Sequence, residues 1–373
     1  IVYAKKGLYK VLGRGVIESE YIFDETRKEY KSLRKIQWTH SGEWEHPGQA
    51  VTKVLTDITA YTDYVQKLEA VFEIEGPIDP PIEPIYPPYT REDFLEEVFM
   101  NDESYNVLVS LLRCKKNIIL QGAPGVGKTF AAKRLAYSIM GEKDTSRFMM
   151  VQFHQSYSYE DFVMGYRPDG NGFRLSEGPF YKFCKIAEGD DERPYFFIID
   201  EINRGNLSKI FGELLMLIEG DKRGERNSLR LLYKDEQFSV PANIHIIGMM
   251  NTADRSLAMI DYALRRRFAF FDMEPAFSSD GFRNRQMAIQ NPKFDALISV
   301  VESLNKAIEA DASLGAGFRI GHSYFCTNEI VNDTLLLSIV ECELIPLLLE
   351  YWFDEPSKVE SWSTRLKGAI NGR

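Results

Sequence analysis

One stretch of the chain has the residue types and spacing of a phosphate site. An apolar run, NIILQ, leads into GAPGVGKT and then into the helical pattern FAAKRLAYSIM. In this G-x-x-x-x-G-K-[ST] pattern, glycine N–H groups and a helix N-terminus face phosphate oxygens. Lys128 should reach the β- and γ-phosphates, and Thr129 should give its hydroxyl to Mg²⁺. The residues expected to hold the nucleotide are Gly122, Ala123, Pro124, Gly125, Val126, Gly127, Lys128, Thr129 and Phe130.

A second candidate site ends another apolar run, YFFIIDE at residues 195–201. Two acids at the end of a strand buried on both faces are costly unless a cation offsets their lost hydration. A nucleotide-bound Mg²⁺ would do so for Asp200, and Glu201 would then polarise the attacking water as general base. Many strands end in acids by way of a turn, but after a phosphate loop this pair indicates hydrolysis of a nucleoside triphosphate.

A third polar cluster, MMNTADRS at residues 249–256, directly follows the apolar run NIHIIG. Ligands of open α/β sheets bind at the carboxyl ends of strands, so this cluster would lie at the ligand-binding end of the sheet. The alternative is a capping turn, because Asn, Thr, Asp and Ser are common at helix N-termini. Asp254 or Ser256 would then cap the next helix.

The elements that must position these side chains alternate along the chain. Short apolar strands at residues 117–121, 148–153, 195–200 and 244–250 alternate with helical patterns, which predicts a parallel sheet between helices. Residues 91–112 have helical periodicity, and from about residue 275 the chain is mostly helical, at residues 294–310 and 332–351. Before residue 77 the pattern is strand-like, apart from a helical stretch at residues 57–71. Six prolines between residues 77 and 88 predict an extended linker.

Together the phosphate loop, YFFIIDE, MMNTADRS and ALRRRF resemble the AAA+ ATPase superfamily. INRGN, MNTADRS, HQSYSYEDFVMGYRP and GFRIGHSYF resemble the McrB proteins, nucleotide-hydrolysing motor subunits of modification-dependent (5-methylcytosine-type) restriction systems. The resemblance covers residues 91–350. It implies an α/β fold, the AAA+ P-loop NTPase αβα sandwich with a parallel sheet and a helical lid, preceded by a small, mostly β segment. The expected domains are residues 1–75 (β-rich), 76–90 (linker), 91–275 (nucleotide-binding) and 276–373 (lid).

The resemblance also implies roles for single residues. Asn251 would be the sensor of the attacking water and the γ-phosphate, and Arg266 or Arg267 the arginine finger that reaches the neighbouring subunit's nucleotide. The alternative for these arginines is a surface salt bridge. The residues implied at the subunit seam are Arg204, Asp254 and Arg255, and those implied to close over base and ribose are His322, Ser323 and Tyr324. A lone histidine is equally well explained as a structural residue.

Two further segments carry weaker expectations. Residues 166–180 read as a glycine-punctuated hairpin between helices, which by resemblance faces a pore or a partner and is otherwise surface loop. The N-terminal part resembles an EVE or PUA-like barrel, a fold that reads modified bases. Its stacking candidates are Trp38, Trp44, Tyr21 and Phe23, and its phosphate candidates are Arg14, Lys31, Arg34 and Lys35. For any single aromatic residue, a place in the core is the preferred interpretation.

Composition limits the function classes. The 373 residues exceed one usual core, and a net charge of −10 argues against a nucleic-acid binder over the whole surface. Residues 1–38 nevertheless hold nine Lys/Arg against five Asp/Glu. The four cysteines form no C-x-x-C pair, which favours a reducing cytoplasm. The apolar runs are too short to span a membrane.

The resulting hypothesis is a GTP-preferring hydrolase that uses Mg²⁺, forms a ring, by family habit a hexamer, and drives translocation of DNA for a McrC-like endonuclease subunit. No nuclease motif stands out in the chain, so cleavage would come from that partner. The preference for GTP over ATP rests on the resemblance alone, because the Asn-Lys-x-Asp signature is absent; Asn305-Lys306-Ala307-Ile308 lacks the Asp. The alternatives are an ATP-dependent AAA+ remodelling chaperone (MoxR-like) and a modified-DNA reader whose nucleotide site is only an assembly switch.

Overall fold

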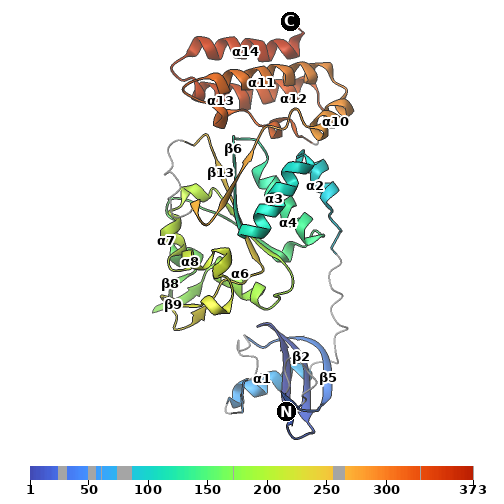
Figure 1. Cartoon of the computed structure of the whole chain (residues 1–373), viewed down its shortest axis with the longest axis vertical. Coiled ribbons are helices and arrows are strands. Elements are labelled where there is room, and N and C mark those ends of the chain that lie inside the picture. Colours follow the sequence, from blue (N-terminus) through green and yellow to red (C-terminus); the bar gives the residue numbers. More distant parts are fainter. Residues whose placement is uncertain are drawn as a thin grey trace. The chain divides into compact units, whose positions relative to one another are not determined.

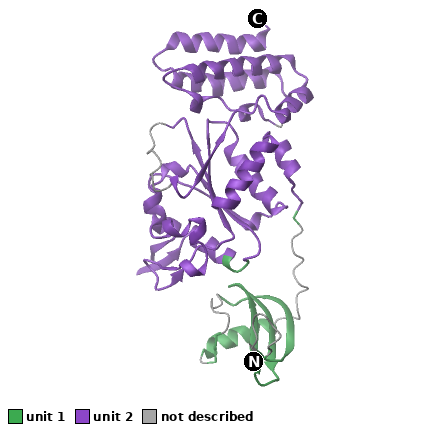
Figure 2. Cartoon of the chain, viewed as in Figure 1, with its two compact units in different colours: residues 1–86, 188–190 green, residues 87–187, 191–373 purple. Residues whose placement is uncertain are grey.

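The computed structural model describes residues 1–23, 32–48, 56–59, 61–73, 86–170, 172–254, 265–327 and 329–372. Two compact units are present: residues 1–86 with 188–190, and residues 87–187 with 191–373 (Figure 2). None of the helices in these ranges is long and apolar enough to cross a bilayer.

The first unit is a small antiparallel sheet with one helix. Strands β1 (Val2–Lys6), β2 (Lys10–Ile17) and β5 (Ile36–Glu45) pair in the order β1-β2-β5, and β3 (Ile22–Phe23) pairs with β4 (Ser32–Leu33). Helix α1 (Thr62–Glu73) packs on the sheet through Phe72, whose ring lies 4.9 Å from that of Trp44. This confirms a small, mostly β N-terminal segment. The helix begins at Thr62 and not near residue 57.

The second unit is built on a five-stranded parallel sheet in the order β14-β6-β13-β10-β7. Its strands are β6 (Asn117–Gly122), β7 (Phe148–Gln152), β10 (Tyr195–Asp200), β13 (Ile244–Asn251) and β14 (Ala269–Met273). Four of them were predicted from the apolar runs. The fifth, β14, was not predicted.

Helices cover both faces of this sheet, which is why its strands are mostly apolar. Phe196 and Ile198 of β10 pack toward one face, and Phe197 and Ile199 toward the other. Figure 1 shows the two helical layers. The first holds α2 (Arg91–Val98), α3 (Asp102–Lys115) and α4 (Lys128–Met140), and the second α5 (Tyr159–Phe162), α6 (Pro179–Glu188), α7 (Leu207–Phe211) and α8 (Leu214–Leu217).

Two predicted helices are interrupted. Residues 91–112 form α2 and α3, because Phe99 adopts a left-handed backbone (φ 58°) that ends α2, and Asn101 then caps α3. Residues 332–351 form α12 (Asp333–Ser338), a π-helical segment (Ile339–Leu344) and α13 (Ile345–Tyr351). Pro346 lies at the start of α13, where its missing N–H interrupts the regular ladder.

The remaining helices form a separate C-terminal domain, here called the lid (Figure 1). It contains α10 (Asp280–Ile289), α11 (Pro292–Ala310), α12, α13 and α14 (Pro356–Asn371) around one core that includes Trp352 and Trp362. The predicted hairpin is β8 (Met164–Asp169) paired with β9 (Gly172–Glu177), and a smaller pair is β11 (Leu229–Arg230) with β12 (Gln237–Phe238). Short 3₁₀ turns lie at Thr145–Arg147, Ile202–Arg204, Gly220–Lys222, Glu225–Asn227, Ala316–Phe318 and His322–Phe325.

The chain enters the second unit against the far end of α4. The Tyr89 N–H donates to the Gly141 carbonyl (3.0 Å), and the Lys143 N–H donates to the Pro87 carbonyl (2.8 Å). The end of the proline-rich stretch is thus bonded to the segment that directly follows α4, the helix that starts at the phosphate loop.

Candidate nucleotide site

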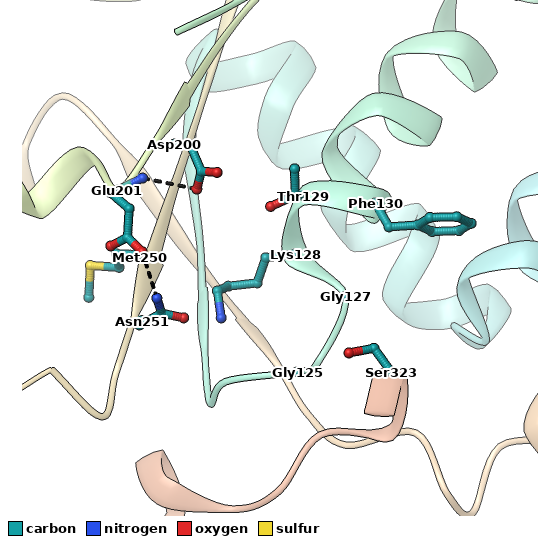
Figure 3. A pocket seen from close by; sticks show the side chains of 10 residues that line it. All are labelled: Gly125, Gly127, Lys128, Thr129, Phe130, Asp200, Glu201, Met250, Asn251 and Ser323. Carbon is teal, nitrogen blue, oxygen red and sulfur yellow. Dashed lines mark hydrogen bonds between the residues drawn. The ribbon is translucent and has the colours of Figure 1, made fainter. Parts of the chain in front are cut away.

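Strand register brings the predicted motifs to one edge of the sheet. β13 lies between β6 and β10, and Asn251 pairs with Gly122. The carboxyl ends of β6, β13 and β10 therefore meet around a cavity of about 370 Å³ (Figure 3). The residues that line it are Gly125, Gly127, Lys128, Thr129, Phe130, Asp200, Glu201, Met250, Asn251 and Ser323.

The loop at residues 122–129 needs its glycines. Gly125 and Gly127 have φ of +76° and +77°, a region that favours glycine, and a Cβ on Gly122 would lie 2.3 Å from the Met273 carbonyl oxygen. Gly127 is the N-cap of α4 and has no side chain to accept from the first N–H groups of the helix. Those N–H groups are thus suited to phosphate oxygens.

Lys128 is buried and folds back onto its own loop. Its Nζ donates to the carbonyl oxygens of Gly122 (3.0 Å) and Ala123 (2.9 Å). Burial lowers the pKa of Lys128 to about 8, although the charges of Glu201 and Asp200 oppose that shift. A triphosphate in the cavity would offer this ammonium group charged acceptors in place of two carbonyls.

Thr129 and Asp200 fit the expected Mg²⁺. Their side-chain oxygens point toward one another across the cavity in Figure 3. No cluster of three His, Cys, Asp or Glu side chains suited to a metal occurs among the described residues. Mg²⁺ usually takes only one or two protein ligands and completes its shell with phosphate oxygens and water, so two protein oxygens suffice.

Glu201 lies at the centre of a hydrogen-bonded chain of four side chains. Its Oε1 accepts from Asn251 Nδ2 (2.9 Å), and its Oε2 accepts from Arg204 Nε (3.2 Å). Arg204 in turn donates from Nη2 to Asp254 Oδ2 (3.1 Å). Glu201 also has a left-handed backbone (φ 51°), and its N–H donates to Asp200 Oδ1 (3.0 Å). Each carboxylate oxygen of Glu201 keeps one lone pair for a water proton.

The structure therefore brings together Asp200, Glu201, Asn251, Arg204 and Asp254, which the sequence could place only as separate motifs. Arg255 and Ser256 lie outside the described residues.

The three consecutive arginines, Arg265 to Arg267, lie near the amino-terminal ends of the strands, at the end of the sheet opposite the cavity. They precede β14, whose first residue, Ala269, pairs with Ile118 near the start of β6. Arg265 and Arg266 are exposed. Arg267 instead donates from Nε to the Leu215 carbonyl (2.8 Å) and pairs with Glu219 (2.9 Å). None of the three lines the cavity of its own chain.

Residues 321–324, here called the strap, join the lid to the phosphate loop. The Gly321 N–H donates to the Pro124 carbonyl (3.1 Å), and the Ser323 N–H donates to the Gly125 carbonyl (2.8 Å). The backbones are so close that a Cβ on Gly321 would lie 1.9 Å from the Gly125 carbonyl carbon. Ser323 lines the cavity, and its contact with base and ribose stays a prediction.

His322 is packed beneath the loop and does not line the cavity. Its Nδ1 accepts from the Ala276 N–H (3.0 Å), and the rings of Phe99, Phe277 and Phe282 surround it. Burial lowers the pKa of His322 to about 4, so the ring is neutral near pH 7. These contacts are those of a structural histidine, which was the alternative interpretation of His322. Tyr324 lies against Gly125 and lines a second hollow beside the first, with Ser323, Cys326, Thr327 and Glu343.

Two features of the cavity were missed from the sequence. Met250 lines it directly before Asn251. The Arg134 guanidinium lies 3.3 Å from the centre of the Phe130 ring, and Glu97 accepts from Arg134 Nε (2.7 Å). The i, i+4 spacing of Phe130 and Arg134 on a helix was the available signal. The link to Glu97 had none.

The residues of the N-terminal unit that were predicted to stack on bases or contact phosphates differ in their exposure. Trp44 is 6% exposed and belongs to the core, whereas Trp38 is 47% exposed and lies across Gly13 and Gly15. Tyr21, Phe23, Arg34 and Lys35 are exposed, and Arg14 pairs with Glu69 (2.8 Å). Lys31 lies outside the described residues.

Comparison with known proteins identifies three regions of the chain. Residues 117–268 match the AAA domain (dynein-related subfamily), residues 296–360 match the McrB α-helical lid domain, and residues 1–62 match a domain of unknown function, DUF8426.

Among curated proteins, the chain is 53% identical over 290 residues to the Type IV methyl-directed restriction enzyme EcoKMcrB subunit of Escherichia coli K12. That match covers 75% of this chain and 63% of the relative. The Type II restriction enzyme BsuMI component YdiS of Bacillus subtilis is 28% identical over 212 residues, which cover 46% of this chain and 60% of the relative. The proteasome-activating nucleotidase of Methanothermobacter thermautotrophicus is 29% identical over 170 residues, which cover 45% of this chain and 35% of the relative.

Proposed function

Because this chain carries an AAA domain followed by a McrB-type α-helical lid, we propose that it is a nucleoside triphosphate hydrolase that drives restriction of modified DNA. The observation that carries the proposal is the convergence of the phosphate loop, Asp200 and the Glu201–Asn251 pair on one cavity beneath the lid. The E. coli relative is a subunit of a methyl-directed restriction enzyme, and the chain spans about 63% of its length.

The side chains divide the work of hydrolysis by position. Lys128 and the first N–H groups of α4 bind the phosphates, and Thr129 and Asp200 hold Mg²⁺, which when bound neutralises charge on the phosphate oxygens. Glu201 takes a proton from the attacking water, and Asn251 fixes the carboxylate through the bond to Oε1. Arg204 holds the second carboxylate oxygen and is itself oriented by Asp254.

In this proposal a neighbouring copy supplies the arginine that completes the site. Among the residues that the structure describes, no arginine lines the cavity, and the exposed Arg265 and Arg266 lie at the amino-terminal end of the sheet, away from it. The six-residue strand β6 separates the two ends of the sheet by about 16 Å. An Arg266 that acts on a nucleotide therefore acts on that of a neighbouring copy, which supports assembly into a ring, by family habit a hexamer. Such an arginine contributes on the order of 10³ to 10⁵ in rate.

The finer parts of the proposal are GTP as the preferred nucleotide, translocation of DNA, and a separate McrC-like endonuclease subunit as partner. The test is nucleotide turnover with GTP and with ATP, with and without the endonuclease subunit, together with the assembly state by mass photometry. We expect turnover with GTP that rises with the endonuclease subunit, and assembly that requires nucleotide. GTP binding without turnover under every condition would contradict the enzymatic role and favour a DNA reader with an assembly switch.

The alternative is ATP-driven remodelling of a protein. The similarity to a proteasome-activating nucleotidase over 45% of the chain favours it. ATP turnover at least as fast as GTP turnover, unaffected by the endonuclease subunit, would support this alternative against the guanine preference.

A further inference from the structure

Arg223 is a buried cation that pairs with no carboxylate among the described residues. Its side chain is enclosed behind the amino-terminal edge of the sheet, and burial lowers the pKa of Arg223 to about 10. Its guanidinium is satisfied by neutral oxygens. Nε donates to the Ile218 carbonyl (2.9 Å), Nη1 to the Ile244 (3.2 Å) and Pro241 (3.4 Å) carbonyls, and Nη2 to Asn117 Oδ1 (2.7 Å). A buried charge without a counter-ion is costly unless its donors are hydrogen-bonded. The bonds of Arg223 therefore hold the oxygens of Ile218, Ile244 and Asn117 in one arrangement.

Asn117 extends these bonds to the arginine segment. It is fully buried at the first position of β6, and its Nδ2 donates to the Ile218 carbonyl (2.7 Å) and to the Arg267 carbonyl (2.9 Å). Its Oδ1 accepts from Arg223. Both amide donors and the acceptor of Asn117 are therefore used within one network.

The same network holds Arg267 through its side chain. Arg267 Nε donates to the Leu215 carbonyl and Nη2 pairs with Glu219, both in or next to α8. The turn around Ile218 thus binds Arg223, Asn117 and Arg267 together. The next residues toward the N-terminus, Arg265 and Arg266, are the exposed ones.

We infer that Asn117 and Arg223 are positioning residues that fix the backbone of residues 265–268 and so aim Arg266 at the neighbouring subunit's nucleotide. Arg267 is then one of the residues that hold this segment in place, and Arg266 is the arginine that reaches the nucleotide. The inference rests on the proposed function, because it needs a nucleotide bound by a second copy. A catalytic group misplaced by 1 Å can lose about 10² in rate, so a long exposed side chain gains from a rigid base.

The test uses mixed assemblies in which each site requires two different subunits. A donor subunit carries Glu201→Gln, which stops turnover at its own site but keeps nucleotide binding and so assembly, and an acceptor subunit carries Arg266→Ala, which leaves its own site intact. In the mixture, turnover requires that a donor supply Arg266 to an acceptor.

We then add Asn117→Asp, which keeps an acceptor for Arg223 and gives up both N–H donations. Added to the donor, this change should lower turnover at least about tenfold. Added to the acceptor, it should leave turnover within about twofold.

A second variant and a control make the result decisive. Arg223→Lys keeps a positive charge but cannot reach Ile218 and Asn117 with a planar fork, so it should show the same asymmetry. If circular dichroism shows that Asn117→Asp does not fold, Arg223→Lys is the variant that tests the positioning role. Asn106→Asp, on the exposed face of α3, should change neither mixture.

Equal losses in donor and acceptor, or no loss in either, would overturn the positioning role. Failure of the proposed function gives a different result. If the wild-type protein hydrolyses neither GTP nor ATP, the proposed function fails. If the Arg266→Ala protein alone turns over nucleotide like the wild type, the proposed function stands, but Arg266 does not act between subunits and the positioning role is overturned.

Discussion

The Glu201 carboxylate is held at both oxygens by partners from different parts of the chain. Asn251 comes from the neighbouring strand and Arg204 from the following 3₁₀ turn. A left-handed backbone on a residue other than glycine is strained, and such strain collects at functional sites. These constraints fix the carboxylate beside the cavity before nucleotide binds, which is what a general base requires.

Glu201→Gln tests this role most directly. The amide keeps the shape and still accepts one hydrogen bond, so nucleotide affinity should stay within about threefold, whereas turnover should fall by about 10² to 10⁴ because a proton acceptor is lost. Phosphate release and binding of a fluorescent nucleotide measure the two effects. Glu192→Gln, at an exposed position before β10, is the matched control. Hydrolysis at the wild-type rate in Glu201→Gln would remove the assigned role.

Side chains within one motif could be predicted from the sequence, and contacts between motifs could not. The spacing of residues 122–129 and the acids at 200–201 indicate their chemistry locally. The bond from Arg204 to Asp254 joins residues 50 apart, and it depends on β13 lying beside β10. Likewise, the spacing could not show that Lys128 folds back onto its loop or that Arg267 is held by Glu219.

At the scale of elements, the strap makes the lid part of the nucleotide site. Gly321 lies where no side chain fits between lid and phosphate loop, and Thr252 Oγ1 adds a bond to the Gly317 carbonyl (2.9 Å). The lid therefore contacts both the phosphate loop, residues 122–129, and the strand end that carries Asn251.

Gly321→Ala should separate these elements. The added Cβ would lie within 2.3 Å of three backbone atoms of Gly125 and Val126, which cannot move as the end of a flexible side chain can. We expect nucleotide affinity to fall about tenfold or more, because the strap can no longer close on the loop. Titration of a fluorescent nucleotide measures this change. Gly172→Ala, where a Cβ meets nothing within 4 Å, should bind like the wild type. Unchanged affinity in Gly321→Ala would show that the lid closes without this contact.

A second element-scale prediction concerns the pH dependence of lid stability. Hydrogen bonds from Lys358, Ser313 and Trp352 hold the pKa of Asp311 far below its usual 3.8, and the bond to Asp311 raises the pKa of Lys358. A depressed carboxyl pKa gives stability that is complete above about pH 4 and is lost as pH falls through the folded value. The raised lysine pKa gives stability that is lost only above about pH 10.

Asp311→Asn should therefore cost about 1–2 kcal/mol of lid stability at pH 7, and less as the pH falls below 4. Urea unfolding followed by tryptophan fluorescence, to which Trp352 and Trp362 of the lid contribute, measures the difference from the wild type at pH 7, 4 and 3.5. A difference that is the same at all three pH values would show that the charge of Asp311 does not stabilise the lid.

Element types were predictable where the hydrophobic pattern was long, and boundaries were not. Strands β6, β7, β10 and β13 were clear from their apolar runs, whereas β14 is a mostly half-buried edge strand that comes shortly after three arginines. The break at Phe99 had no glycine or proline to mark it, since Phe99 itself adopts the left-handed conformation.

The described residues form two compact units, and the three hydrophobic clusters of the second unit contain only its own residues. The second contains every residue of the cavity, and the first contains the exposed Trp38 and the basic residues near the N-terminus. The boundaries at residues 75, 90 and 275 and the EVE or PUA-like character of the first unit remain predictions from the sequence.

A shortened chain that starts at Tyr86 tests this division. Residues 87–89 are bonded to Gly141 and Lys143, so the second unit keeps its first anchor, and turnover should stay within about twofold of the full chain. If the first unit reads modified bases, methylated DNA should bind the full chain and not the shortened one in a mobility-shift assay. Full-length Glu201→Gln is the control, since it should still bind DNA. Equal DNA binding by both chains would place the DNA contact in the second unit.

The strap has one more consequence, which concerns measurement. The amide protons of Gly321 and Ser323 are bonded to carbonyls of the phosphate loop, so they exchange with deuterium only when the lid moves away. Their exchange rates therefore report how often the lid opens, without a label or a mutation. A nucleotide that closes the lid slows the exchange of these two amides. Comparing the two rates with GTP and with ATP would rank the nucleotides by how firmly each closes the lid, independently of turnover.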